Sequence, residues 1–81
     1  MSIFAALMLV AAQSAPAIVT ACDRLAAHPN DPDRVTAGVP ERQVDTAAAI
    51  AACKVAVAAD PGNGRLNYQL ARALGYAGRG A

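Results

Sequence analysis

Cys22 and Cys53, the two cysteines of the chain, are the residues best suited to chemistry. Two cysteines can form a structural disulfide, cycle as a redox pair or contribute to a metal site. Catalytic redox pairs usually occupy a Cys-x-x-Cys motif at a helix N-terminus, whereas these cysteines lie 31 positions apart in alanine-rich sequence. We therefore expect a disulfide between two helices, with a redox pair and two buried free thiols as the alternatives.

Other residue types form no catalytic or metal-binding pattern. His28, the single histidine, precedes a proline and is expected to be solvated or to cap a helix C-terminus. It does not share a helix face with Cys22, and one histidine with two distant cysteines makes a poor zinc site. Asp31, Asp33 and Asp45 lack the spacing and the closing glutamate of an EF-hand. We expect no catalytic residue, cofactor or metal, so the chain is not predicted to be an enzyme.

The N-terminus has the pattern of a secretory signal peptide. Residues 3–12 form an uncharged apolar run, too short for a bilayer span, which needs about 20 apolar residues. The run Ala15-Pro16-Ala17 supplies a cleavage site, so residues 1–17 are predicted to be removed and the mature chain to begin at Ile18. Because no lysine or arginine precedes the apolar run, a buried N-terminal helix is the alternative. Export predicts a periplasmic or secreted bacterial protein, without a transmembrane helix in the mature chain, in a compartment where disulfides persist.

A further alternative concerns Cys22. The sequence Val19-Thr20-Ala21-Cys22 loosely fits the lipobox, in which a cysteine that follows small residues becomes lipid-modified. Lipidation would anchor the protein through Cys22 and leave Cys53 as an unpaired thiol.

Composition favours one small helical domain. The chain has 81 residues, of which 56% are hydrophobic and 4% aromatic, and alanine supplies much of the hydrophobic share. Alanine has the highest helix propensity, whereas strands favour β-branched and aromatic residues. The net charge is +1, from seven basic and six acidic residues spread along the chain. No basic stripe of the kind that binds nucleic acid is visible, so we expect no nucleic-acid partner.

The first two helices are predicted over residues 18–27 and 46–59. The first ends at His28-Pro29, because the residue before a proline avoids the helical conformation. The connection over residues 30–44 contains prolines and a glycine, which exclude a regular element. A connection of this length is unusual in so small a domain, so we expect it to fold against the helices or to contact a partner. Asp45 is the expected N-cap of the second helix.

Helical spacing places both cysteines on apolar faces, which comprise Ile18, Cys22 and Leu25 in the first helix and Ile50, Cys53 and Val57 in the second. If these faces pack as an antiparallel hairpin, both sulfur atoms point into one interface. A disulfide there would stabilise the fold by about 3–4 kcal/mol.

A third helix is predicted over residues 64–77, after a turn at residues 60–63, and Gly78 is expected to end it. One face carries apolar residues at helical spacing, namely Leu66, Leu70, Leu74 and Ala77. A separate stripe, expected to be a partly exposed flank, consists of Tyr68, Arg72 and Tyr76.

From Ala47 onward the sequence resembles a tetratricopeptide or Sel-like repeat. Residues 49–61 are similar to the second helix of one repeat and its terminating proline, and residues 63–78 to the first helix of the next. The stretch from Cys22 to Gly78 further resembles the N-terminal module of exported bacterial proteins that carry Sel-like repeats. The matching segments are Cys22-Asp23-Arg24-Leu25-Ala26-Ala27-His28-Pro29, Asp31-Pro32-Asp33-Arg34, Gly38-Val39-Pro40, Asp45, Ala52-Cys53 and Gln69-Leu70-Ala71-Arg72-Ala73-Leu74.

The resemblance implies an all-α, α-solenoid-type module over residues 18–78, followed by a short tail at 79–81, that binds proteins or peptides and has no catalytic residues. Solenoids need about three repeats to bury a continuous core, so we expect the third helix to expose a leucine face. This predicts a surface for an unknown partner, self-association, or a reading frame truncated within a longer repeat protein. A small redox protein that uses Cys22 and Cys53 is the alternative function. The candidate partner surface consists of Leu66, Tyr68, Leu70, Leu74 and Tyr76.

Overall fold

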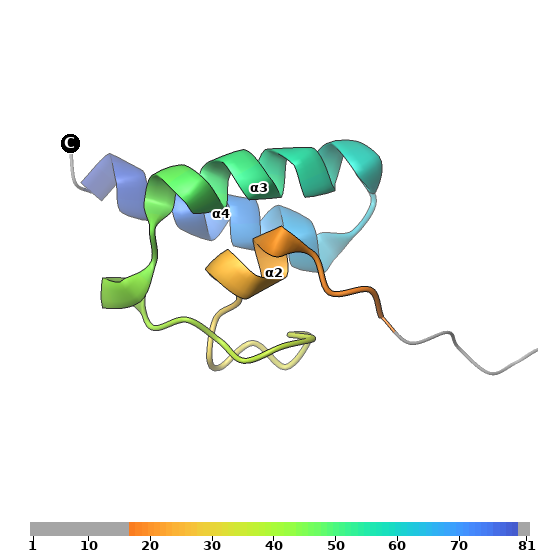
Figure 1. Ribbon diagram of the computed structural model, residues 1–81, viewed down its shortest axis with the longest axis horizontal. Helices are drawn as coiled ribbons and strands as arrows, with labels where there is room; N and C mark the ends of the chain where they lie inside the picture. The colour runs from red at the N-terminus through yellow and green to blue at the C-terminus, as the bar shows by residue number, and fades with distance from the viewer. Residues whose placement is uncertain (1–16, 80–81) are drawn as a thin grey trace, which may run out of the picture.

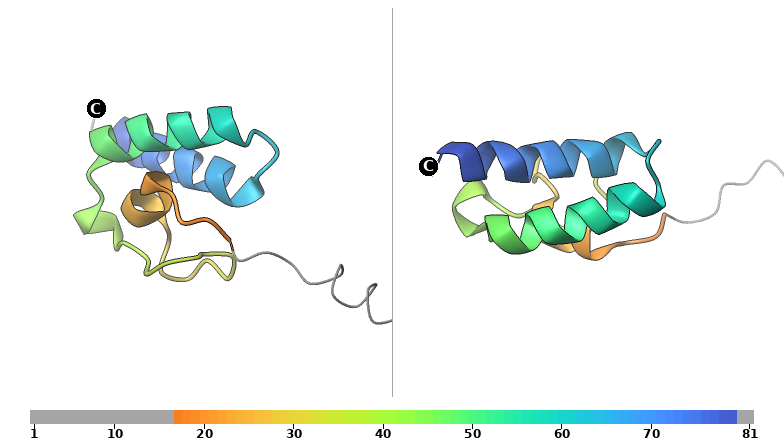
Figure 2. Two further views of the ribbon diagram at one scale, coloured as in Figure 1. Left: turned by 45° about the vertical axis from the view of Figure 1, so that its right-hand side comes forward. Right: turned by 90° about the horizontal axis from the view of Figure 1, so that it is seen from above.

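The computed structural model describes residues 17–79, which fold into three α-helices and one turn of 3-10 helix. In chain order these are α2 (Ala21–Ala26), η1 (Glu41–Gln43), α3 (Thr46–Ala59) and α4 (Gly64–Arg79). α3 and α4 form an antiparallel hairpin, and α2 packs against both of them (Figure 1, Figure 2). No strand occurs among residues 17–79, so the predicted all-α class is confirmed there. Apart from Ala17, the predicted signal peptide lies outside the described residues.

α2 is shorter than the predicted first helix because Thr20 caps it. The Thr20 hydroxyl accepts a hydrogen bond from the Asp23 N–H at 3.2 Å, and the Asp23 carboxylate accepts one from the Thr20 N–H at 2.8 Å. This reciprocal capping box starts the helix at Ala21. Ile18, predicted to lie in the first helix on the face of Cys22, precedes the cap and is 81% exposed, so that prediction is wrong.

The predicted bounds of the other two helices hold except at the end of α4. α3 spans the predicted residues, and its N-cap Asp45 accepts a hydrogen bond from the Ala48 N–H at 3.1 Å. α4 begins at Gly64 as predicted but continues through Gly78 to Arg79, so the prediction that Gly78 ends the helix is wrong. A glycine cap usually adopts a positive φ, and none of the described glycines does.

Small side chains let the three helices pack closely around one disulfide. Cys22 of α2 and Cys53 of α3 are bonded, with their Cα atoms 4.5 Å apart, and both are fully buried. The predicted disulfide is therefore confirmed. Apart from Ile18, the predicted apolar faces of the first two helices lie in or against this core. Around the cysteines the core contains Ala26, Ala49, Ala56, Leu66 and Ala73, with Leu25, Val44, Ile50, Val57 and Leu70 packed against it.

Candidate functional site

The residues predicted as a partner surface do not share one exposed face of α4. Leu66 is 2% exposed and belongs to the core, so its predicted exposure is wrong. Leu70 is partly buried and packs against the same core, because α2 and α3 cover this side of α4. Tyr68 and Leu74 are 47% and 46% exposed, and Tyr76 is half-buried.

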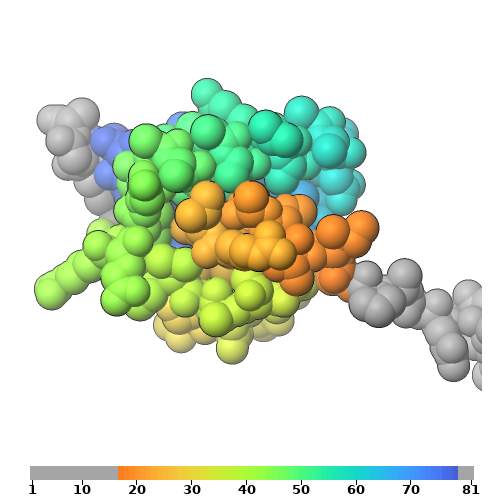
Figure 3. Space-filling view, viewed as in Figure 1, coloured from red at the N-terminus to blue at the C-terminus, as the bar shows by residue number. Residues whose placement is uncertain are grey.

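The connection after α2 contains a compact loop, residues 28–38, whose ends are held together. At its neck the Val39 N–H donates to the Ala27 carbonyl at 2.7 Å. Compact surface loops of this length with adjoining ends are Ω-loops, which frequently carry functional residues. The space-filling view shows the yellow and green loop packed beneath the orange α2 (Figure 3). The connection is irregular as predicted, apart from the single turn η1.

Arg72 of α4 holds this neck from inside the fold. Its Nη1 donates to the carbonyls of Ala26 and Ala27 at 3.0 and 2.9 Å, and its Nη2 donates to the Val39 carbonyl at 2.6 Å. Its Nε donates to the Tyr76 hydroxyl at 3.0 Å. Arg72 is buried, so its predicted place on a partly exposed flank is wrong. One buried arginine thus ties both ends of the loop to α4.

Replacing Arg72 with methionine is expected to release the neck of the loop and to lower the free energy of unfolding by about 1–3 kcal/mol, because buried carbonyls lose their donors. Hydrogen exchange should show that the Val39 amide loses protection while the amides of α3 keep theirs. Arg24→Met is the matched control, since Arg24 is exposed on α2. Equal effects of the two substitutions would contradict the anchoring role of Arg72.

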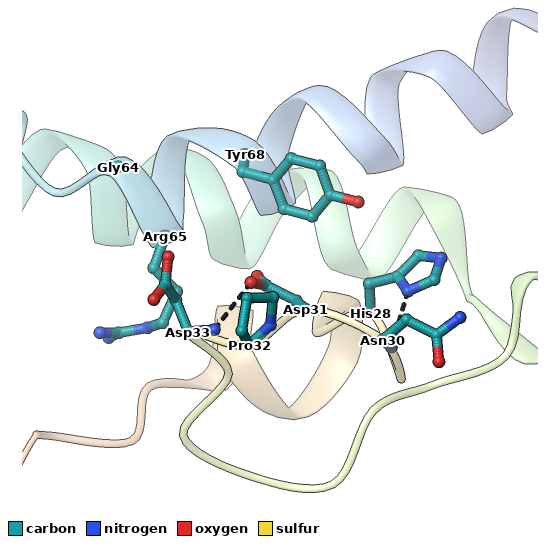
Figure 4. A pocket seen from close by; sticks show the side chains of 8 residues that line it. All are labelled: His28, Asn30, Asp31, Pro32, Asp33, Gly64, Arg65 and Tyr68. Atoms are coloured by element: carbon teal, nitrogen blue, oxygen red, sulfur yellow. Dashed lines mark hydrogen bonds between the residues drawn. The ribbon is translucent and has the colours of Figure 1, made fainter.

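The loop and α4 flank an open groove of about 580 Å³, which we name the loop–α4 groove. Figure 4 shows Tyr68 of α4 on one side of it and Asp31 and His28 of the loop on the other. A second hollow of about 340 Å³ is lined in part by Ala71 and Gly75 of α4. The two hollows share His28 and Tyr68, so the groove continues along α4.

Hydrogen bonds within the loop fix two of the polar side chains that line this groove. Nδ1 of His28 accepts a hydrogen bond from the Asn30 N–H at 2.9 Å. Oδ1 of Asp31 accepts one from the Asp33 N–H, also at 2.9 Å, as is typical of an Asx-turn. The loop side of the groove is therefore shaped by hydrogen bonds within the loop itself.

Asp23 links the start of α2 to the other wall of the groove. Its fully buried carboxylate accepts hydrogen bonds from Arg65 Nε at 2.8 Å, the Thr20 hydroxyl at 2.9 Å and Gln69 Nε2 at 3.1 Å. Burial raises the pKa of Asp23, but the hydrogen bonds from Arg65, Thr20 and Gln69 outweigh it and bring the pKa below its ordinary value of 3.8. This role of Asp23 is not among the predictions from the sequence. The spacing of Thr20 and Asp23 in a capping box was the available signal.

Stability is expected to fall as the pH drops below the ordinary pKa of Asp23. A carboxylate with a lower pKa in the folded than in the unfolded chain stabilises the fold above the unfolded-state pKa, and this contribution is lost as the pH falls through the folded-state pKa. Chemical denaturation at pH values from neutral to strongly acidic should show the decline, and Asp23→Asn should make it shallower. An equally steep decline in the variant would assign the acid sensitivity to other carboxylates.

Comparison with known proteins assigns no family. No protein-family model matches the chain, and neither a curated protein nor a solved structure matches it.

Gln69 lies beside the buried disulfide, with its Nε2 3.3 Å from Cys22 Sγ. Its Oε1 is buried and has no hydrogen-bond partner among the described residues. Within residues 17–79, no three His, Cys, Asp or Glu side chains are grouped closely enough to hold a metal ion. None of the helices in that part of the chain has the length and apolar character that a membrane span requires.

Proposed function

We propose that this chain is a non-catalytic, exported helical-repeat module, of the tetratricopeptide or Sel-like type, that binds a partner protein or peptide in the loop–α4 groove. The observation that carries the proposal is that hydrogen bonds within the protein itself shape the groove. Buried Arg72 holds the loop from behind, while Tyr68 is exposed on the facing wall. A surface that is ordered before binding loses less conformational freedom on association, and tyrosine is enriched at interfaces.

The disulfide supports export, and the contacts of the residues after Ala17 support the predicted cleavage site. Disulfides persist in oxidising compartments such as the bacterial periplasm. The Ile18 carbonyl accepts a hydrogen bond from Arg65 Nη2 at 3.4 Å, and Thr20 caps α2. A lipoprotein processed at Cys22 would lose both residues, and the Cys22 sulfur is already bonded to Cys53. These contacts favour cleavage after Ala17 over lipidation.

A thiol–disulfide redox function has less support. A catalytic pair needs a sulfur atom that a thiolate can attack. Cys22 and Cys53 are both fully buried. We therefore assign the disulfide a structural role.

Site-specific photo-crosslinking in cells that export the full chain tests the binding proposal. A photoreactive residue in place of Tyr68 should form discrete adducts with a partner. The same group in place of Val55, which is 72% exposed on α3, should form none. Adding Arg72→Met should abolish the adducts at position 68, because the loop loses its anchor. Adducts at both positions alike, or at neither, would count against the groove as a binding site.

Mass spectrometry of the exported protein tests the compartment. We expect an N-terminus at Ile18 and a crosslinked peptide that contains Cys22 and Cys53. A diacylated Cys22, or an intact Met1 with both thiols open to alkylation, would contradict the proposed processing.

A further inference from the structure

The charged groups of the loop–α4 groove that form no ion pair with another described residue are acidic. Asp31 and Asp33 line it and form no ion pair within residues 17–79. Arg65, which also lines it, is paired with buried Asp23 at 2.8 Å. Arg34, the next residue in the loop, donates from Nη1 to the main-chain carbonyl of Asp31 at 2.9 Å. A ligand that enters the groove therefore meets two carboxylates that no side chain of this part of the protein neutralises by direct contact.

Tyr68 adds an aromatic surface across from these carboxylates (Figure 4). The side chain is exposed, and its hydroxyl forms no hydrogen bond with another described residue. An aromatic ring attracts a cation that lies within about 6 Å of its centre. The fold contains one such pair next to the groove, where the guanidinium of Arg72 lies 5.0 Å from the centre of the Tyr76 ring.

We infer that the loop–α4 groove takes an arginine or lysine side chain of a partner protein, with its cation between the Tyr68 ring and the carboxylates of Asp31 and Asp33. This inference rests on the proposed function and specifies the chemistry of the partner. The carbon stem of such a side chain finds apolar contacts at Pro32 and Ala71, which line the two connected hollows. The required partner is a segment with an exposed basic residue.

Amide-resolved NMR titration of the full, disulfide-bonded chain with two short blocked peptides tests the inference. One peptide carries a single central arginine, and the other carries citrulline, which has a similar shape without the charge. The arginine peptide should shift the amides of the loop and of Tyr68, with a dissociation constant on the order of 1 mM. The citrulline peptide should bind about tenfold more weakly, because it lacks both the cation–π and the carboxylate contacts. Added salt should weaken the binding of the arginine peptide.

Two variants and a control separate the contributions of the carboxylates and of the Tyr68 ring to binding of the arginine peptide. Asp31→Asn combined with Asp33→Asn should weaken binding of the arginine peptide about fivefold, and an asparagine oxygen at position 31 keeps the turn of the loop. Tyr68→Leu should weaken it about threefold, since leucine retains an apolar surface but not the aromatic ring. Asp60→Asn is the matched control: it removes an exposed carboxylate from the α3–α4 turn and should leave binding unchanged. Unchanged thermal unfolding should verify that each variant is folded.

Equal binding of the arginine and citrulline peptides, or tighter binding of a matching glutamate peptide, would overturn the inference while crosslinking at position 68 still supported partner binding. Shifts along α4 that grow with protein concentration in the absence of peptide would identify a second copy as the occupant and would also overturn it. If the arginine peptide causes no shifts and position 68 forms no crosslinks, the proposed function itself is contradicted.

Discussion

Replacing Asp23 with alanine is expected to lower the free energy of unfolding by about 3–5 kcal/mol, the range for breaking a buried ion pair by removing one partner. The carboxylate is fully buried and joins α2 to α4 through Arg65 and Gln69. Without it, the Arg65 guanidinium has no counter-charge at contact distance, and Gln69, whose Oε1 already lacks a hydrogen bond, loses an acceptor for its Nε2. The capping box with Thr20 is lost in the same step.

Urea denaturation with Asp45→Ala as the control measures this effect. Both carboxylates cap a helix, but Asp45 is exposed and bonds only within its own cap, so its loss should cost about 1 kcal/mol. If Asp23→Ala lowers the free energy of unfolding no more than Asp45→Ala does, the contacts of Asp23 with α4 contribute nothing to stability. A double-mutant cycle with Arg65→Met then isolates the coupling between the two charges, which should be favourable.

Local signals in the sequence predict the ends of α3 and the start of α4 correctly. Asp45 bonds to an amide three residues away, and the turn at residues 60–63 is closed by the Asn63 N–H and the Asp60 carbonyl at 3.1 Å. Such signals act over a few positions, so a single sequence contains them. The end of α4 is different, because Gly78 is compatible both with a helix and with its termination, and the sequence around it does not decide between them.

The orientation of α4 depends on contacts that no local pattern specifies. The sequence shows a row of leucines at helical spacing, but only the position of α2 and α3 decides that Leu66 is buried while Leu74 is exposed. Helical periodicity identifies a face and does not say which element covers it.

The sequence predicts part of the candidate site, because Tyr68 and the connection over residues 30–44 are expected partner contacts, but it does not predict that Arg72 joins them. Arg72 bonds to carbonyls that lie 33 to 46 positions earlier in the chain, so its burial follows from the packed fold and not from its neighbours in sequence. Gly38 is a similar case, because a Cβ at that position would lie 2.3 Å from backbone atoms of Pro29. Both residues lie in segments that carry the family resemblance, yet their physical roles appear only when the loop closes against α4.

Removing the disulfide by Cys22→Ala together with Cys53→Ala is expected to lower the free energy of unfolding by about 3–4 kcal/mol. The bond links residues 31 positions apart, and its loss increases the conformational entropy of the unfolded chain. The core consists largely of alanines, and domains of this size are marginally stable without a crosslink. The cysteines therefore supply a large share of the stability that holds the groove together.

The reduced wild-type chain is the control for the packing of the two sulfur atoms, because it lacks the crosslink but keeps both side chains. It should unfold at nearly the same denaturant concentration as the double variant, and both should unfold well before the oxidised protein. Since Cys22 and Cys53 are fully buried, a thiol reductant should react only with opened molecules, so the reduction rate should rise as urea is added. Rapid reduction at a rate independent of urea would instead show that a sulfur atom is accessible in the folded protein, and this would restore the redox interpretation at the expense of the structural one.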